Sequence, residues 1–404
     1  MDEKDMVQHS KKLMIAIMGI SLVLSTSGAI SGTIPLMEKH FANMSTATVE
    51  LIVTIPSAAG IFVPLLAGFI EKVTGKKLLA LLGLAVTAIC GVLPAFTGSY
   101  GLILFSRIMV GVGISLLTPL SVSYITDIYD EVKANELLGY RNSFINIGST
   151  VLLFLAGYLI KISWHAAYWV FILALIPLAM TLFWIPKKFD NYSVTVAEDV
   201  DQQKIKQTTN WAIIGYAVLF GIMQVSYMGI NLKIPSYIVN NHIGDSSTGS
   251  FILSLLPIAA IVSGLLYKYI YKAWGKNTTA ISATIAGIAL GLTLVLNNSF
   301  LIGTCVVVSG FFWGIMNPHM TELFALSSPK GSMTLSTSIV IFGINIGGTL
   351  APYVFQSLGK MFKNNSPESG LLISAVIWTV FGIVFLLANM MIKSQKTTGK
   401  EDEK

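Results

Sequence analysis

The residues that could do chemistry in this sequence are a few charged side chains inside long apolar stretches. Arg107 lies about two helical turns into one such stretch, and Arg141 and Lys233 lie in two others. A charge inside an apolar membrane segment is costly and by default marks a functional site. An incoming anion would offset part of the cost of an unpaired buried cation. We therefore expect these three cations to attract or bind an organic anion.

The acidic side chains near these stretches lie toward their ends, so we expect no equally deep acid to balance the cations. These acids are Glu38, Glu50, Glu71, Asp127 and Glu322. Two alternatives stay open. Arg107 could only hydrogen-bond neighbouring helices, and Lys233 could pair with Glu38 or Glu50 as an outer gate instead of binding the anion.

Amide and hydroxyl groups occur in the same stretches at helical spacing. Gln224, Tyr227 and Asn231 share one helix face at i, i+3 and i+7, and we include them among the candidate binding residues. Asn146 and Asn345 are also candidates, and cavity lining and interhelical hydrogen bonding are equally open for them.

A stripe of small residues on the first predicted helix favours close helix packing. It consists of Ser21, Ser25, Gly28 and Gly32.

His319 and Glu322 are candidates for proton coupling. The five histidines show no metal-ligand spacing, and no Ser or Cys stands in a recognisable nucleophile setting. We therefore predict no catalytic residue, no metal and no cofactor, so a membrane enzyme is disfavoured.

The elements that must position these residues are membrane-spanning helices. Only 11% of the 404 residues are charged, 54% are hydrophobic and the mean hydropathy is +0.73, whereas soluble domains carry roughly 25% charged residues. A helix needs roughly 20 apolar residues to cross the hydrocarbon core, and twelve such stretches recur. We predict spans at 13–35, 48–70, 78–96, 100–126, 137–160, 166–185, 211–239, 248–271, 278–296, 300–325, 333–358 and 370–392.

The positions of Lys and Arg indicate the orientation of the chain. With the N-terminus inside, 19 of the 26 cations lie in inner segments, counting Lys268 at the inner end of the span 248–271. Four lie in outer segments and three lie deeper within spans. Short cytoplasmic loops accumulate Lys and Arg, so both termini are expected in the cytoplasm and the chain in the plasma membrane. The net charge of +6 then reflects topology, and no nucleic-acid partner is implied.

The chain repeats itself across a polar segment near its middle. We predict a six-helix bundle at 1–188, a cytoplasmic linker at 189–209 and a second bundle at 210–404. Five features recur in order at offsets of 199 to 201 residues. They are Ile34-Pro35 with Ile234-Pro235, Ile55-Pro56 with Leu256-Pro257, Gly75-Lys76 with Gly275-Lys276, Gly111 and Pro119 with Gly310 and Pro318, and Ile145–Gly148 with Ile344–Gly347.

An offset of six spans preserves orientation, so the halves form a parallel repeat. Transporters built in this way bind solute near the membrane midplane and alternate access by rocking one half against the other.

Two motifs resemble the major facilitator superfamily, and the resemblance covers the full chain. Between the second and third spans stands Gly68-Phe-Ile-Glu-Lys-Val-Thr-Gly-Lys-Lys77, similar to the family's Gly-rich motif. Its candidate gating residues are Gly68, Glu71, Lys72, Gly75, Lys76 and Lys77, joined by Gly111 and Gly113 of a second motif that begins at Arg107. Lys72 replaces the family's usual Asp and Val73 its following Arg, so a charge relay here requires Glu71 as the acid.

The resemblance implies an all-α membrane protein with twelve helices in two bundles and a secondary active transport function. We expect a monomer that moves a small organic solute, anionic or amphipathic, with proton coupling implied by the family alone. Drug efflux by proton antiport is the alternative, although the fifth span lacks the Gly-Pro pair of many antiporters. A membrane solute sensor is the remaining alternative.

Overall fold

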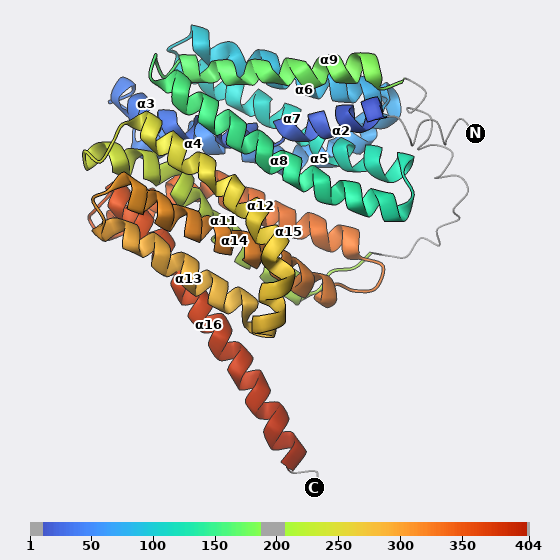
Figure 1. Cartoon of the computed structure of the whole chain (residues 1–404), viewed down its shortest axis with the longest axis vertical. Coiled ribbons are helices and arrows are strands. Elements are labelled where there is room, and N and C mark those ends of the chain that lie inside the picture. The colour runs from blue at the N-terminus through green and yellow to red at the C-terminus, as the bar shows by residue number, and fades with distance from the viewer. Residues whose placement is uncertain (1–10, 187–206, 402–404) are drawn as a thin grey trace. The chain divides into compact units, whose positions relative to one another are not determined.

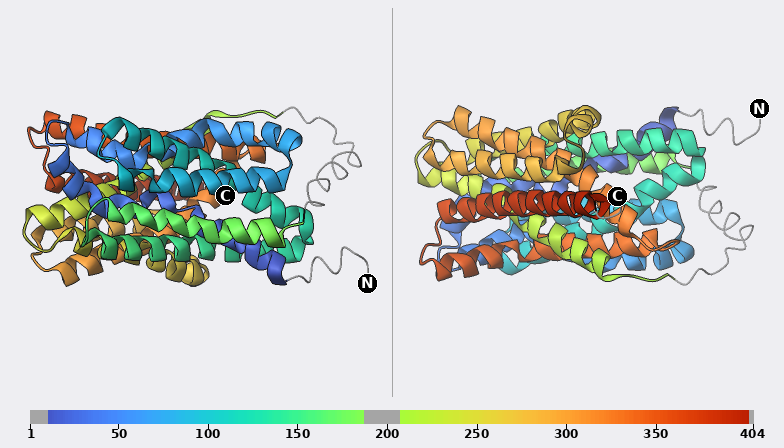
Figure 2. Two further views of the ribbon diagram at one scale, coloured as in Figure 1. Left: turned by 90° about the horizontal axis from the view of Figure 1, so that it is seen from above. Right: turned by 90° about the horizontal axis from the view of Figure 1, so that it is seen from below.

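The fold is built from helices alone in the part of the chain that the structure describes. The structure is a computed structural model that describes residues 11–186 and 207–401. No strand occurs within these ranges. The predicted linker at 189–209 falls largely outside them. Within each unit the helices lie side by side (Figures 1 and 2).

The described chain divides into two compact units. Unit 1 is drawn from Met1–Gln207 with Gly348–Pro352, and unit 2 from Thr208–Gly347 with Tyr353–Lys404. The helices of unit 1 are α2 (Lys11–Val23), η1 (Thr26–Thr33), α3 (Ile34–His40), α4 (Thr46–Thr54), α5 (Pro56–Thr74), α6 (Lys76–Val92), η2 (Leu93–Phe96), α7 (Tyr100–Ile128), α8 (Glu131–Ile160), η3 (Ala166–Ala174) and α9 (Leu175–Trp184). Those that begin in unit 2 are α11 (Trp211–Asn240), α12 (Ser246–Trp274), η5 (Gly275–Asn277), α13 (Thr278–Leu292), η6 (Thr293–Val295), α14 (Ser299–Ser327), α15 (Met333–Met361) and α16 (Pro367–Glu401).

The number of membrane crossings agrees with the sequence prediction. Eleven apolar helical stretches of the described residues are long enough to cross a membrane. One of them, Ser246–Val295, is 50 residues long and contains both α12 and α13. Because a crossing needs roughly 20 residues, this stretch crosses twice, and the described chain holds twelve crossings.

The first crossing is interrupted where Ser, Thr and Gly cluster. After α2, the segment Thr26–Thr33 winds as a 3₁₀ helix, η1, before α3 begins. Ser and Thr compete with the backbone for hydrogen bonds, and Gly carries an entropic cost in a helix. Accordingly, Ser31 and Thr33 donate their hydroxyl protons to carbonyls of their own turn, at 2.9 and 2.7 Å.

The second crossing is interrupted by a proline. Pro56 has no backbone N–H, so the carbonyl of Ile52, four residues earlier, has no donor in a regular α-helix. The helix accordingly ends at Thr54, and α5 begins at Pro56. In unit 2, by contrast, α12 continues through Pro257 without a break. The two halves therefore differ at this repeated proline.

Glycines mark close helix contacts that recur in both units. A Cβ atom added at Gly148 on α8 would overlap the backbone of Leu22 on α2, and one added at Gly347 on α15 would overlap the backbone of Gly221 on α11. Each residue of the second contact stands 199 positions after its counterpart in the first. The repeated sequence thus folds into a repeated contact between the first and fifth crossings of each half.

This contact gives a direct test of the packing. Gly148→Val and Gly347→Val should each lower the free energy of unfolding by about 1–3 kcal/mol, because an overpacked core forces backbone shifts. Gly264→Val is the matched control, since a Cβ there meets no described atom within 4 Å. Thermal unfolding of the purified chain in detergent measures all three. Equal midpoints for the three variants would contradict the close contact.

Candidate functional site

The Gly68–Lys77 motif forms a turn that brings a lysine into the protein. A single residue, Gly75, separates α5 from α6 and has φ 79°, a conformation that favours glycine. Lys76 follows at the first position of α6 and is only 2% exposed. The glycine therefore allows the turn that buries the Lys76 side chain.

Lys76 lies between two carboxylates, and these three side chains form an ion-pair cluster. The Lys76 Nζ atom pairs with Asp127 on α7 and lies 3.7 Å from Oε1 of Glu71 on α5. The Ser123 hydroxyl donates to Asp127 at 3.2 Å. Glu71 is thus one of two acids close to the motif's buried lysine. Asp127 was expected only as an acid near a span end, and the sequence did not single it out as the partner of Lys76.

The other two lysines of the motif have different surroundings. Lys72 is exposed. Lys77 donates to the backbone carbonyl of Leu182, in the last turn of α9, at 2.8 Å. Lysines near helix C-termini complement the free carbonyls and the helix dipole there, so Lys77 attaches the motif to α9.

Arg107 is fully buried in unit 1 and connects three crossings. Its Nε atom donates to the Ile52 carbonyl at 3.0 Å, and its Nη2 atom donates to the Ser27 carbonyl at 2.5 Å. The guanidinium also lies 5.2 Å from the ring centre of Phe171. Arg107 thereby satisfies the carbonyl that Pro56 leaves without a helical donor. Its Nη1 atom has no hydrogen-bond partner among the described residues.

Gly111 and Gly113 allow α7 to approach its neighbours closely. A Cβ atom at Gly111 would overlap the backbone of Pro56, and one at Gly113 would overlap Gly83 and Thr87. Gly111 lies one turn after Arg107 on the same helix. The second motif therefore holds α7 against α5 and α6, at the break that Arg107 stabilises.

Glu50 corrects the expectation that no acid lies as deep as the cations. It stands on α4 and is 0% exposed, as fully buried as Arg107. Its position near the start of the second crossing was predicted, but the packing of that crossing against its neighbours was not. Within the described residues, a carboxyl group therefore shares the interior of unit 1 with the guanidinium.

The remaining predicted residues of unit 1 are less buried. Arg141 is half-buried, and its Nε atom donates to the Ser121 hydroxyl at 2.7 Å. Asn146 is also half-buried, and its Nδ2 atom donates to the Asn142 carbonyl of its own helix at 3.1 Å. The cations are thus unequal in depth, because Arg107 and Lys233 are buried and Arg141 is not.

In unit 2, the polar face of α11 meets an aromatic side chain of α14. Tyr227 stacks on Trp313 with ring centres 4.9 Å apart. Asn231, which is 8% exposed, donates its Nδ2 proton to the Tyr227 carbonyl at 3.2 Å. Gln224 is half-buried on the same helix. Three predicted binding residues therefore share one region at the centre of α11.

Lys233 and Asn345 lie elsewhere in unit 2. Lys233 is 6% exposed, and its Nζ atom lies 5.6 Å from the ring centre of Phe355 on α15. A Cβ atom at Gly370 on α16 would overlap its side chain. Asn345 is half-buried on α15. Lys233 is thus packed among α11, α15 and α16.

His319 acts as a cap for a neighbouring helix. Its Nδ1 atom accepts the backbone N–H of Thr279 at 3.2 Å and lies 2.6 Å from the Thr279 hydroxyl. A backbone N–H only donates, so Nδ1 is an acceptor and the neutral ring carries its proton on Nε2. Thr279 is the second residue of α13, where backbone N–H groups lack helical partners. This geometry supports a structural role for His319.

Glu322 lies on α14, three residues after His319, and it is exposed. Its Oε2 atom accepts the Tyr267 hydroxyl at 3.4 Å. A carboxyl group that is accessible and hydrogen-bonded to a phenol can exchange a proton. Of the two predicted proton-coupling residues, Glu322 has the surroundings that suit this role.

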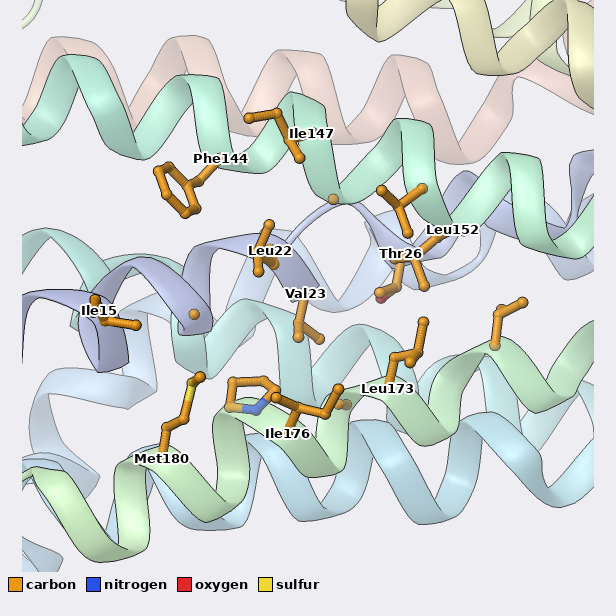
Figure 3. Close-up of a pocket in the computed structure, with 16 residues that line it drawn as sticks. Ile15, Leu22, Val23, Thr26, Phe144, Ile147, Leu152, Leu173, Ile176 and Met180 are labelled. Atoms are coloured by element: carbon orange, nitrogen blue, oxygen red, sulfur yellow. The ribbon is translucent and has the colours of Figure 1, made fainter. Parts of the chain in front are cut away.

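An apolar groove of about 310 Å³ lies within unit 1. Figure 3 shows side chains of α2, η1, α8, η3 and α9 around it, with Thr26 near its centre. Thr26 supplies the one hydroxyl of the lining, and that hydroxyl has no hydrogen-bond partner among the described residues. The lining includes no charged side chain and none of the predicted binding residues. The groove therefore suits hydrocarbon and offers nothing to pair an anion.

Comparison with known proteins decides the family. The sequence model of the Major Facilitator Superfamily matches residues 14–352. The chain belongs to the Major Facilitator Superfamily. The multidrug efflux protein YfmO of Bacillus subtilis (strain 168) is 25% identical over 386 residues, which cover 94% of this chain and 89% of YfmO.

Solved structures of this superfamily share the fold. The inward-open xylose transporter XylE from E. coli matches with a TM-score of 0.72 at 15% identity, over 93% of this chain and 94% of XylE. A variant of the nucleoside transporter NupG matches with a TM-score of 0.71 at 15% identity, over 93% of this chain and 99% of NupG. This superfamily protein therefore has the transporter fold that its motifs predict.

The ion-pair cluster can be tested by exchanging its charges. Lys76→Gln and Asp127→Asn should each lower the free energy of unfolding by about 1–3 kcal/mol, since breaking a partly buried pair leaves one charge without its partner. The charge-exchanged double variant, Lys76→Asp with Asp127→Lys, should lose less free energy of unfolding than the sum of the losses in the single variants Lys76→Asp and Asp127→Lys. Lys72→Gln is the control, because Lys72 is exposed. Strict additivity in thermal unfolding would show that the pair contributes nothing.

The role of His319 can be separated from proton transfer. His319→Ala should destabilise the chain by about 1–3 kcal/mol, because the Thr279 N–H loses its acceptor, and should leave the pH dependence of transport unchanged. Glu322→Gln is the comparison, and it should alter that pH dependence without a similar loss of stability. The measurements are thermal unfolding and uptake at several pH values. If the pH dependence of uptake shifts in the His319 variant, His319 takes part in proton coupling and the structural role alone is contradicted.

Proposed function

We propose that this superfamily member is a secondary active transporter that moves a small organic anion by alternating access. The observation that carries the proposal is the Nη1 atom of Arg107, a buried donor without a hydrogen-bond partner among the described residues. Hydrogen bonds from a guanidinium to a carboxylate or phosphate are among the strongest in proteins. The Nε and Nη2 atoms of Arg107 already donate to backbone carbonyls. An anion that reaches Nη1 would accept a hydrogen bond from this remaining nitrogen of the guanidinium.

The other candidate binding residues of each unit are also proposed to take part in solute recognition. Lys233 supplies a buried positive charge in unit 2, as Arg107 does in unit 1. Gln224, Tyr227 and Asn231 supply hydrogen-bonding groups at the centre of α11. Arg141, Asn146 and Asn345 are half-buried, which leaves them accessible to a solute during part of the transport cycle.

An ion gradient would supply the energy. The Gly68–Lys77 motif is not a Walker A loop, because six residues separate its glycines and Lys77 stands where Ser or Thr is required. A proton is the proposed coupling ion, with Glu322 or the buried Glu50 as its carrier. Members of this class need no catalytic residue, and we assign none.

We propose that the chain is a monomer in the plasma membrane, with both termini in the cytoplasm. The support is the excess of Lys and Arg on one side of the crossings. In this orientation the cluster of Lys76, Glu71 and Asp127 lies at the inner surface. The cluster would then stabilise conformations in which α5, α6 and α7 stay together at that surface.

Efflux of hydrophobic or cationic drugs by proton antiport is the second candidate function. Glu50 favours it, because a fully buried carboxyl group could carry a proton or pair with a cationic drug. The similarity to YfmO, named a multidrug efflux protein, adds to this support. The two candidates predict opposite charges for the transported solute.

Uptake into liposomes distinguishes the two functions. Purified protein with an imposed pH gradient should accumulate members of a panel of organic anions and should not move lipophilic cations. Lys233→Gln should weaken the affinity for the transported anion about tenfold or more, because a charge-assisted hydrogen bond contributes about 1.5–3 kcal/mol. Robust movement of a lipophilic cation, with no anion moved, would establish efflux instead.

Variants of Arg107 need separate measurements of folding, binding and transport. Arg107→Lys keeps the charge and loses the planar fork of donors, so it should retain part of the anion affinity. Arg107→Gln should lose the affinity. Thermal unfolding identifies any variant that no longer folds. Glu50→Gln is the matched control, because it changes another fully buried charge of unit 1. Unchanged anion binding in a folded Arg107→Gln variant would confine Arg107 to its structural role.

A further inference from the structure

Three aromatic rings from three crossings of unit 2 lie nearly parallel. The Tyr227 and Trp313 rings are inclined by 15°, and the Trp313 and Trp378 rings are inclined by 13° with centres 5.7 Å apart. We name Tyr227, Trp313 and Trp378 the aromatic ladder. Trp378 on α16 is fully buried, whereas Tyr227 and Trp313 are half-buried. The ladder is therefore fully buried at Trp378 and partly exposed at Tyr227 and Trp313.

The aromatic ladder lies at the middle of the crossings that carry it. Trp313 is the central residue of α14, which runs from Ser299 to Ser327. Tyr227 lies close to the centre of α11, between Trp211 and Asn240. Transporters of parallel-repeat architecture bind solutes near the membrane midplane. Arg107 and Lys233 lie nearer to the ends of their helices.

Two asparagines flank the rings in matching positions. Asn231 follows Tyr227 by four residues, and Asn317 follows Trp313 by four residues. Each Asn donates its Nδ2 proton to the carbonyl of that aromatic residue, at 3.2 Å in both cases. Two crossings, α12 and α13, lie between α11 and α14 in the chain, so the two helices run antiparallel. The amides therefore lie on opposite sides of the stacked rings, along the membrane normal.

The repeat shows that the fold does not require the ladder. The residues that stand 199 positions before Tyr227, Trp313 and Trp378 are Gly28, Ile114 and Ala179. A Cβ atom at Gly28 would meet no described atom within 4 Å. Unit 1 thus forms the equivalent crossings without any of these rings. An aromatic feature that only one half carries, at mid-depth, is better explained by recognition than by packing.

We propose that the aromatic ladder binds the ring of a planar aromatic solute, stacked on the face of Tyr227 that is opposite Trp313. The amide groups of Gln224 and Asn231, on either side of Tyr227 along α11, bind polar substituents of that ring. Stacking requires a flat π-system and tolerates variation in its substituents. This inference rests on the proposed transport function, and it narrows the solute to an aromatic carboxylate or a similar aromatic anion.

Competition between two matched anions tests the ring. Binding of radiolabelled benzoate to the purified chain in detergent is competed with unlabelled benzoate and with cyclohexanecarboxylate. The two have the same charge and similar size, and only benzoate is planar. Benzoate should bind about tenfold more tightly, the ratio that corresponds to one aromatic stacking interaction. Equal competition by cyclohexanecarboxylate would overturn the proposal.

Substitutions in the aromatic ladder locate the effect. Tyr227→Leu and Trp313→Leu should remove the preference for benzoate, and Tyr227→Phe should retain it because the ring remains. Trp274→Leu is the matched control, since Trp274 stacks on Phe312 and not on the ladder. A preference that survives both leucine variants would place the aromatic site elsewhere. If the leucine variants do not fold, the competition ratio in the unchanged protein still decides.

The experiment also separates this inference from the proposed function. Uptake of aliphatic anions without any benzoate binding would overturn the aromatic site and leave anion transport standing. Binding of neutral benzamide as tightly as benzoate, lost in Trp313→Leu, would support the aromatic site and contradict the requirement for an anion. Failure of every anion in both binding and uptake would remove the proposed function itself.

Discussion

The interior of unit 1 depends on two hydrogen bonds from Arg107 to backbone carbonyls. In a membrane, water is not available to satisfy backbone groups, so an irregular helix needs donors from the protein. Pro56 leaves the Ile52 carbonyl without a helical donor. One guanidinium binds this carbonyl and that of Ser27, which lies in the 3₁₀ segment of the first crossing. Gly111 then brings α7 close enough for this contact. A single charged residue therefore lets two broken helices exist side by side.

The two halves use the same framework for different chemistry. In unit 1, the described structure holds buried charges at Arg107, Glu50 and Lys76. In unit 2, the repeated positions of the first helix carry Gln224, Tyr227 and Asn231 in place of Ser25, Gly28 and Gly32. In a duplicated fold, the repeated helix contacts can stay the same while the side chains that differ between the halves change which solute is bound. We therefore propose that the repeat supplies the scaffold and that the departures from it supply the specificity.

Much of the architecture could be predicted from sequence because hydropathy and the repeat offset are properties of the chain itself. The twelve crossings follow from such patterns, and so does the correspondence of Gly148 with Gly347, although their contacts with Leu22 and Gly221 were not predicted. The partner of Lys76 could not be predicted, because Asp127 is distant in sequence and only the packing of α6 against α7 brings the two together. Glu50 was placed correctly near a helix start, but its burial depends on neighbouring helices that no local pattern describes. The roles of the binding residues remain predictions, since hydrogen-bonding groups at mid-depth serve packing and recognition alike.

Solute counterflow tests the central claim, that this chain is a carrier with alternating access. Liposomes containing the protein are loaded with unlabelled benzoate at about pH 8, where a carboxylic acid is almost fully ionised, and are diluted into trace labelled benzoate. A carrier that exposes its site to one side at a time exchanges the two pools, so the label should accumulate transiently above its external concentration. Equilibration without this overshoot, or no dependence on the internal benzoate, would contradict the account.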